Sequence, residues 1–199
     1  MCTNSTDFAD YNKLVDNGIP LLFFDKVPEN ISYNKISIDD EKASIIAAEW
    51  TLKLKSKNVL ALFGNKKLSI TNRRLQAFKV KIGKSKTNID YQHVSSSKEA
   101  EDMCQKLLKS KKFDSIFCMS DEILIGVMAA IQKANTTKPV SIEVFCMSDG
   151  FFPTIYYPQI SYVETSGFKL AKGAYEVMTK MLQSKIPAKE YFVEPTLII

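Results

Sequence analysis

The side chains that perform most enzyme chemistry are scarce in this sequence and form no known catalytic pattern. There is one histidine, His93, on an expected strand, where a lone histidine is more often a packing residue than a catalyst. No serine lies in a G-x-S-x-G elbow, and neither phosphate-binding glycine motif, G-x-G-x-x-G or G-x-x-x-x-G-K-[ST], occurs. No pair of carboxylates stands out as a catalytic acid and base. The inventory predicts a binding protein with no catalytic residue and no cofactor.

The four cysteines give no sign of a metal site or a disulfide framework. Cys2, Cys104, Cys118 and Cys146 are widely spaced and form no C-x-x-C. The N-terminus has no basic stretch followed by an apolar one, and no apolar run approaches the ~18 residues that span a bilayer. We therefore expect reduced thiols, no metal, no membrane partner and a cytoplasmic location.

The positive charge comes almost entirely from lysine. The net charge is +5, and the only arginines are the adjacent Arg73 and Arg74. Aromatic residues do not interleave with the lysine clusters, as they do on surfaces that stack nucleic-acid bases. The lysines are therefore interpreted as a solvated surface, and the chain itself is not expected to read DNA.

The apolar pattern alternates short strands with helices. A chain of 199 residues with 45% hydrophobic and 25% charged residues is an ordinary globular chain, of one domain or two small lobes. Continuous apolar strands that alternate with helices predict an α/β fold with a parallel sheet covered on both faces. Strands are expected over 20–25, 35–39, 58–64, 89–94, 114–119, 141–147, 160–163 and 190–199, and helices over 7–17, 40–57, 71–83, 97–110, 121–134 and 167–185.

Polar side chains follow several of these strands. Ligands of open parallel sheets bind outside the carboxyl ends of the strands, so residues at those ends are the candidates for a binding site. They should meet if their strands are neighbours. The residues are Asp25, Arg74, Ser120, Asp121, Ser148 and Asp149.

An ordered set of segments resembles one family. The segments are GIPLLFFDKV (18–27), ISIDD (36–40), GNKKLSITNRRLQAF (64–78), FDSIFCMSDEILIG (113–126), VFCMSDG (144–150) and YPQISYVETSGFKLAKGA (157–174). They are similar to the effector-binding domain of LacI/GalR-type transcriptional regulators. The resemblance covers essentially the whole chain and implies a two-lobed, type I periplasmic-binding-protein-like fold.

The resemblance also implies how the lobes are built. The family's N-terminal helix-turn-helix, which reads DNA, has no counterpart in the sequence. The first lobe is expected to be truncated, a remnant made of 1–39 and 164–188. The second lobe, made of 40–163 and 189–199, is expected to be complete.

The resemblance assigns site residues one by one. Arg74 matches an arginine that donates paired hydrogen bonds to ligand hydroxyls, a geometry that lysine cannot imitate. Asp25 matches a first-lobe acidic residue that accepts from a hydroxyl, and its alternative is a turn residue at a strand end. Ser120 replaces a frequent asparagine and also suits a helix N-cap. Ser148, with Asp149 next to it, stands where many relatives have an aspartate that binds sugar hydroxyls.

The implied function is non-enzymatic sensing of a small polar metabolite, such as a sugar, in the cleft between the lobes. The expected partners are a second copy, in a homodimer, and operator DNA, reached only through the absent helix-turn-helix. The alternative is a periplasmic solute-binding protein of a sugar transporter. An enzyme on the same scaffold is a third interpretation, disfavoured because no nucleophile–base pair is present.

The truncation would leave strand 20–25 short of neighbours. Its apolar pattern is that of an interior strand, so we expect Phe23 and Phe24 each to expose much of the ~150–250 Å² that a buried aromatic ring hides. Such an edge favours self-association through the first lobe. The aromatic stretch 151–158 is expected either to place a ring against a ligand or to form a buried cluster.

Overall fold

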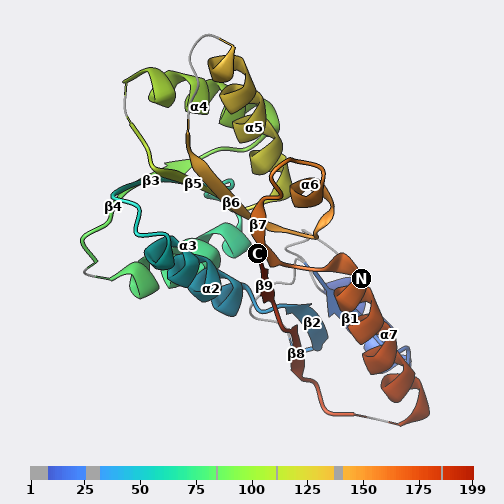
Figure 1. The fold of residues 1–199 in the computed structure, drawn as a ribbon. Helices are drawn as coiled ribbons and strands as arrows, with labels where there is room; N and C mark the ends of the chain where they lie inside the picture. Colours follow the sequence, from blue (N-terminus) through green and yellow to red (C-terminus); the bar gives the residue numbers. More distant parts are fainter. Residues whose placement is uncertain (1–8, 26–31, 84, 111, 137–140, 185) are drawn as a thin grey trace. The chain divides into compact units, whose positions relative to one another are not determined.

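The computed structural model describes residues 9–25, 32–83, 85–110, 112–136, 141–184 and 186–199, and the chain in it divides into two compact units (Figure 1). The first unit consists of Met1–Asp40 and Ser166–Pro195. The second consists of Glu41–Thr165 and Thr196–Ile199. Each unit is described by itself below.

The second unit is built on the expected parallel sheet. Its described strands run in the order β4-β3-β5-β6-β7-β9, and every neighbouring pair is parallel except β7 with β9. The α/β class predicted from the apolar runs is confirmed. The strands are β3 (Asn58–Phe63), β4 (Asn88–His93), β5 (Ser115–Cys118), β6 (Glu143–Ser148), β7 (Ser161–Glu164) and β9 (Thr196–Ile198).

One face of this sheet carries an aromatic core. Phe63 of β3 and Phe117 of β5 pack at 5.6 Å between ring centroids, and Phe78 of α3 (Ser69–Ile82) stacks on Phe117 at 5.0 Å. All three rings are fully buried. The helix α2 (Asp40–Lys53) lies beside α3, and Lys81 of α3 forms an ion pair with Glu49 of α2 at 2.5 Å. Stacked and edge-to-face rings on neighbouring elements hold α3 firmly on the sheet.

The opposite face is covered by α4 (Ser97–Ser110) and α5 (Asp121–Asn135), which lie side by side in Figure 1. Cys118 and Cys146 are paired in register on β5 and β6, so their side chains share this face. Burial raises the pKa of Cys118 and Cys146 and that of Cys104, on α4, the last to about 12. These three thiols are free and buried, as expected for reduced cysteines, while Cys2 lies outside the described residues.

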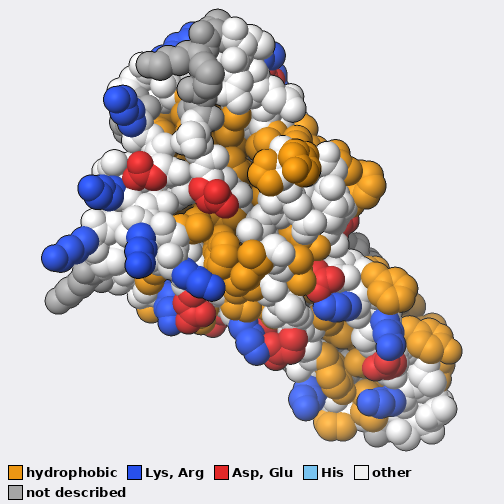
Figure 2. All heavy atoms as spheres, viewed as in Figure 1, with side chains coloured by type: hydrophobic (Ala, Val, Ile, Leu, Met, Phe, Trp, Pro, Cys, Tyr) orange, Lys and Arg blue, Asp and Glu red, His pale blue; other side chains and the backbone are white. Residues whose placement is uncertain are grey.

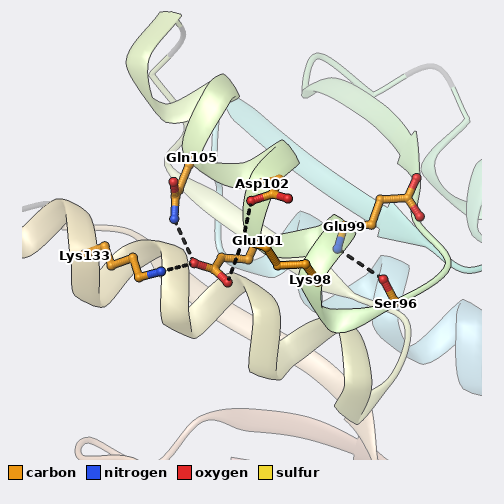
Figure 3. Close-up of polar contacts among 7 residues, drawn as sticks. All are labelled: Ser96, Lys98, Glu99, Glu101, Asp102, Gln105 and Lys133. Atoms are coloured by element: carbon orange, nitrogen blue, oxygen red, sulfur yellow. Dashed lines mark hydrogen bonds and ion pairs between the residues drawn. The ribbon is translucent and has the colours of Figure 1, made fainter.

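Polar contacts fix the rim of the α4–α5 pair (Figure 3). Lys133 of α5 donates to the Glu101 carboxylate of α4, and Gln105 Nε2 donates to the same carboxylate at 2.9 Å. At the start of α4, Ser96 Oγ accepts from the Glu99 N–H at 3.2 Å, and Glu99 Oε2 accepts from the Ser95 N–H at 2.7 Å, so the two side chains cap the first turn of the helix.

The first unit has a three-stranded parallel sheet in the order β1-β2-β8, formed by β1 (Leu22–Phe24), β2 (Asn34–Ile38) and β8 (Glu190–Val193). The long helix α7 (Gly167–Gln183) packs on it through Leu170 and Val177. A short helix, α1 (Ala9–Asp16), begins the described part of the chain.

The expectation of a single C-terminal strand over 190–199 in the second lobe is wrong. Residues 190–193 form β8, which pairs in parallel with β2 of the first unit. Residues 196–198 form β9, which pairs antiparallel with β7 of the second unit. Pro195 lies between them, and proline has no backbone N–H for a sheet ladder, so the strand ends there and the chain changes unit.

The expectation that Phe23 is exposed is also wrong. Its side chain is only 1% exposed, because the rings of Tyr11 from α1 and Tyr33 each lie 5.4 Å from it. Phe24 is half-buried. Local aromatic residues therefore cover Phe23, although β1 pairs with β2 alone among the described strands.

The close crossing of α4 and α5 depends on Gly126. A Cβ there would lie 2.1 Å from the Ser97 carbonyl oxygen and 2.8 Å from Ala100 Cβ, so both helices would have to separate. We expect Gly126→Ala to lower the free energy of unfolding by about 1–3 kcal/mol, as overpacked core sites do, measured by urea denaturation.

The matched control is Gly167→Ala, since a Cβ at Gly167 meets nothing within 4 Å. It should change the free energy of unfolding by less than about 1 kcal/mol. Equal stability of the Gly126→Ala chain and the parent would contradict the close packing.

Candidate ligand-binding site

The carboxyl ends of three neighbouring strands gather polar residues at one edge of the second unit's sheet. Because β3, β5 and β6 are adjacent and parallel, the loops after them begin at the same edge. Gly64, Met119 and Asp149 are the first residues after these strands. The strands that precede the candidate residues of the second unit are therefore neighbours in the sheet, as expected.

Arg74 is buried at this edge and joins two elements. Its Nη1 donates to the Met119 carbonyl at 3.2 Å, and the Met119 N–H donates to the Leu62 carbonyl at 3.0 Å. The guanidinium thereby fastens α3 to the end of β5, which is a different environment from that of a solvated surface arginine. Its predicted contact with ligand stays a prediction.

Ser120 caps α5. Its Oγ accepts from the Ile123 N–H at 3.4 Å, and its backbone is extended, as at a helix N-cap. The capping role expected from the sequence is confirmed. The side chain is half-buried, and its ligand role stays a prediction.

Ser148 and Asp149 differ sharply in exposure. Ser148 is 1% exposed, and its Oγ accepts from the Gly150 N–H at 2.9 Å, so the hydroxyl serves the loop itself. Asp149 is exposed, and its Oδ1 accepts from the Phe151 N–H at 3.1 Å at the start of α6 (Phe151–Thr154). Of the two predicted contacts with ligand, the geometry favours the Asp149 carboxylate.

Asp121 has a structural role that the sequence did not predict. Its Oδ2 accepts from the Asp149 N–H at 3.2 Å, while its Oδ1 is buried and has no hydrogen-bond partner within the described part of the chain. Burial raises the pKa of the carboxyl, and hydrogen bonds from Ser148 and the Asp149 backbone act in the opposite direction. The available signal was its position, directly after a buried strand and in the first turn of a helix.

Asp25 belongs to the other unit. It follows β1, where its N–H donates to the Ile36 carbonyl at 3.1 Å. Its φ of 68° lies in the left-handed region, which aspartate adopts more readily than most residues and which suits a turn at a strand end. A role of Asp25 in ligand binding stays a prediction.

The aromatic stretch 151–158 contains both half-buried and exposed rings, and contact of any of them with a ligand stays a prediction. Phe152 and Tyr156 are half-buried and pack against the core, whereas Phe151 and Tyr157 are exposed.

His93 is half-buried, with its Nδ1 2.9 Å from the Gly64 carbonyl oxygen. Within the described residues, no group of three or more His, Cys, Asp or Glu side chains is placed to hold a metal ion. No described helix is long and apolar enough to cross a membrane.

The buried carboxyl makes stability depend on pH. Because the pKa of Asp121 is higher in the folded chain than in the unfolded chain, the folded chain binds the proton more tightly. Stability therefore falls as pH rises from the unfolded pKa, about 3.9, through the folded one. Asp121→Asn should remove this fall and raise the unfolding temperature at pH 7, while Asn Oδ1 can still accept from Asp149.

The comparison variant is Asp149→Asn, at the neighbouring exposed carboxylate. The charge of Asp149 is the smallest of the effects that act on the pKa of Asp121, so this variant should weaken the fall only slightly. Thermal unfolding followed by circular dichroism between pH 4 and 8 measures both variants. If Asp121→Asn is less stable than the parent at pH 7, the carboxylate is stabilising and the argument fails.

Comparison with known proteins identifies the family. A model of the periplasmic binding protein domain matches residues 11–186. The probable HTH-type transcriptional regulator EndR of Paenibacillus polymyxa is 24% identical over 90% of this chain and 54% of its own length. The ribose operon repressor of Haemophilus influenzae is 22% identical over 100% of this chain and 61% of its own length.

The fold is shared with solved structures. The crystal structure of a LacI family transcriptional regulator from Enterococcus faecium with bound ribose matches with a TM-score of 0.84 at 16% identity, over 98% of this chain and 74% of that one. This confirms the periplasmic-binding-protein-like fold inferred from the ordered segments. The chain spans little more than half the length of the curated relatives named above. Since the family model matches most of the sequence, the chain belongs to the periplasmic binding protein domain family.

Proposed function

We propose that this chain is the ligand-sensing part of a cytoplasmic LacI-type transcriptional regulator and that its ligand is a sugar or a similar polyhydroxylated metabolite. Both curated relatives named above are regulators rather than transport proteins, and one is a repressor of a ribose operon. The regulator would act as a homodimer without enzymatic activity. Operator DNA would be read by a helix-turn-helix outside residues 1–199.

The proposal is carried by one arrangement: a buried arginine and an exposed carboxylate at the carboxyl edge of a parallel sheet. This edge is where open α/β sheets bind ligands. A guanidinium offers rigid donors, and a carboxylate accepts from hydroxyls, so Arg74 and Asp149 together suit a ligand rich in hydroxyl groups. Ser120, at the same edge of this sheet, would supply a further polar contact.

The bond from Arg74 to Met119 supports this role by fixing the guanidinium before ligand arrives. A long side chain held by a backbone carbonyl loses little further freedom on binding, which favours affinity. The same bond means that Arg74 also contributes to folding. Replacement of Arg74 is therefore expected to affect folding as well as ligand binding.

Titration calorimetry with ribose tests the proposal. The parent chain should bind ribose, and Arg74→Lys should weaken binding by about 10- to 150-fold, the loss of about 1.5–3 kcal/mol that accompanies removal of a charged hydrogen bond. The matched control is Arg73→Lys, at the adjacent half-buried arginine, which should bind as the parent does. A panel with xylose and glucose ranks related sugars.

Thermal unfolding of each variant without ligand separates affinity from folding. Arg74→Lys should unfold at a lower temperature, because Met119 loses a buried partner, so calorimetry is performed where every variant is fully folded. Parent-like affinity in folded Arg74→Lys would remove Arg74 from the site. Failure of the parent to bind any sugar of the panel would contradict the sugar-sensing proposal.

A further inference from the structure

Exposed lysines gather at the amino edge of the second unit's sheet, the edge opposite the candidate ligand-binding site. The parallel neighbours β3, β4 and β5 begin together at this edge, with Asn58 in register with Asn88 and Val59 with Ser115. The loop before each strand carries an exposed lysine. These three loop lysines are Lys57 before β3, Lys86 before β4 and Lys112 before β5. Figure 2 shows Lys or Arg side chains projecting on the left of the view, the side on which β4 lies in Figure 1.

The helices that cover the sheet bring further lysines to the same edge. Each of α2, α3, α4 and α5 is followed directly by a strand of this sheet, so the last turn of each helix lies where that strand begins. All four last turns are basic. Their lysines are Lys53, Lys79, Lys81, Lys109 and Lys133. Lysines that are far apart in the sequence therefore meet at one edge of the fold.

Ion pairs engage lysines of the helices and leave the loop lysines available. Lys81 pairs with Glu49, and Lys133 pairs with Glu101. Within the described residues, the loop lysines form no ion pair. The helix dipole favours cations in the last turn of a helix, but its effect falls off within that turn. It does not account for lysines that come after the helices have ended.

Backbone hydrogen bonds hold the three loops side by side. Asp114 Oδ2 accepts from the N–H groups of Lys57 and Asn58 at 2.7 and 2.8 Å, which joins the loop before β5 to the loop before β3. The Asn88 N–H donates to the Lys57 carbonyl at 2.8 Å, which joins the start of β4 to the same loop. Neighbouring strands lie about 4.8 Å apart, so the loop lysines form a row about 10 Å long on a fixed backbone.

We propose that this row, with the helix-end lysines beside it, binds the phosphate backbone of duplex DNA without reading its sequence. Lysine is a compact point charge on a flexible stem, which suits contact with phosphate and supplies no readout of bases. The contact is separate from a helix-turn-helix and needs no ligand in the candidate site.

The charge density of the duplex favours it over other polyanions. Duplex DNA carries one negative charge per about 1.7 Å of its axis, whereas an extended acidic polypeptide carries at most one per about 3.3 Å. A fixed row of lysines therefore releases more counterions from the duplex.

The aromatic rings near this edge disfavour single-stranded nucleic acid. Proteins bind single strands by stacking the bases on open aromatic rings. The Trp50 ring is buried with Lys53 Nζ 5.1 Å from its centroid, and the half-buried Tyr91 ring has Lys79 Nζ at 4.8 Å. Neither ring offers an open face, so the surface is suited to phosphates alone.

Fluorescence anisotropy with labelled duplexes of two unrelated sequences, each about 20 base pairs long, tests the proposal. At about 20 mM NaCl the parent should bind both equally. The binding constant should fall with salt with a log–log slope of about −3 to −5, since each neutralised phosphate contributes about −0.9. The triple variant Lys57→Gln/Lys86→Gln/Lys112→Gln should bind at least tenfold more weakly, with a slope smaller by about 2–3.

The matched control is Lys169→Gln/Lys172→Gln/Lys180→Gln, which removes three exposed lysines from α7 of the first unit. It loses the same net charge and should bind within about twofold of the parent. Equal weakening by both triple variants would overturn the proposal, because net charge alone would then govern binding. A parent that does not bind at 20 mM NaCl would overturn it as well.

A charge-retaining variant separates the charges from the fold. Lys57→Arg/Lys86→Arg/Lys112→Arg should bind as tightly as the parent, and a tenfold loss in this variant would overturn the proposal. Circular dichroism should show that every variant is folded, because the replaced side chains form no ion pair within the described residues.

Competition tests the assignment to duplex DNA. Unlabelled duplex should displace the labelled one at a lower concentration of negative charge than polyglutamate or vesicles of phosphatidylserine and phosphatidylcholine. Stronger displacement by either competitor would overturn the assignment, and a tenfold preference for one duplex would overturn binding without sequence readout. No assay involves a sugar, so the sensing proposal can fail without affecting this one.

Discussion

The parallel pairing of β3, β5 and β6 is the constraint on which the candidate site depends. Parallel strands end at the same edge, so loops that begin at Gly64, Met119 and Asp149, far apart in the sequence, begin side by side. This arrangement needs both faces of the sheet to be covered, which the aromatic packing of α3 and the close α4–α5 pair achieve. The position of the polar residues at this edge therefore depends on the apolar packing on both faces of the sheet.

Two residues at this edge have opposite effects on the stability of the fold. Arg74 strengthens the fold through the Met119 carbonyl while presenting a guanidinium to the edge. Asp121 organises the loop after β6 but leaves a buried carboxylate oxygen without a partner among the described residues, which disfavours its charged form. A site that binds polar ligands commonly keeps such unsatisfied groups because their arrangement serves binding.

Much of the fold follows from local sequence patterns. The continuous apolar run at 58–64 and the cap at Ser120 are short-range signals, and each element that they predict is present. The burial of Phe23 is different, because it depends on rings that come from Tyr11 and Tyr33, ten or more residues away. The division of the C-terminal segment has a local signal in Pro195, but the sheet that each half joins depends on pairing with β2 and β7, far away in the sequence.

For the site, the sequence could locate strand ends but not side-chain directions. Ser148 and Asp149 are adjacent, and a shift of one residue along a strand end exchanges buried for exposed. The sequence therefore placed both at the edge, and only the structure distinguishes the loop-supporting hydroxyl from the exposed carboxylate. The sequence likewise places Asp121 at a strand end but assigns it no role, because its hydrogen bond comes from a loop residue 28 positions away.

The central claim, that a sugar binds at the carboxyl edge of the second unit's sheet, is tested most directly by hydrogen exchange with and without ribose. The account predicts that ribose slows exchange at the amides of 64–68, 119–123 and 148–151. Amides at the opposite edge, around Asn58 and Asp114, should exchange at unchanged rates. Protection confined to that opposite edge, or none at any concentration up to 10 mM ribose, would contradict the claim.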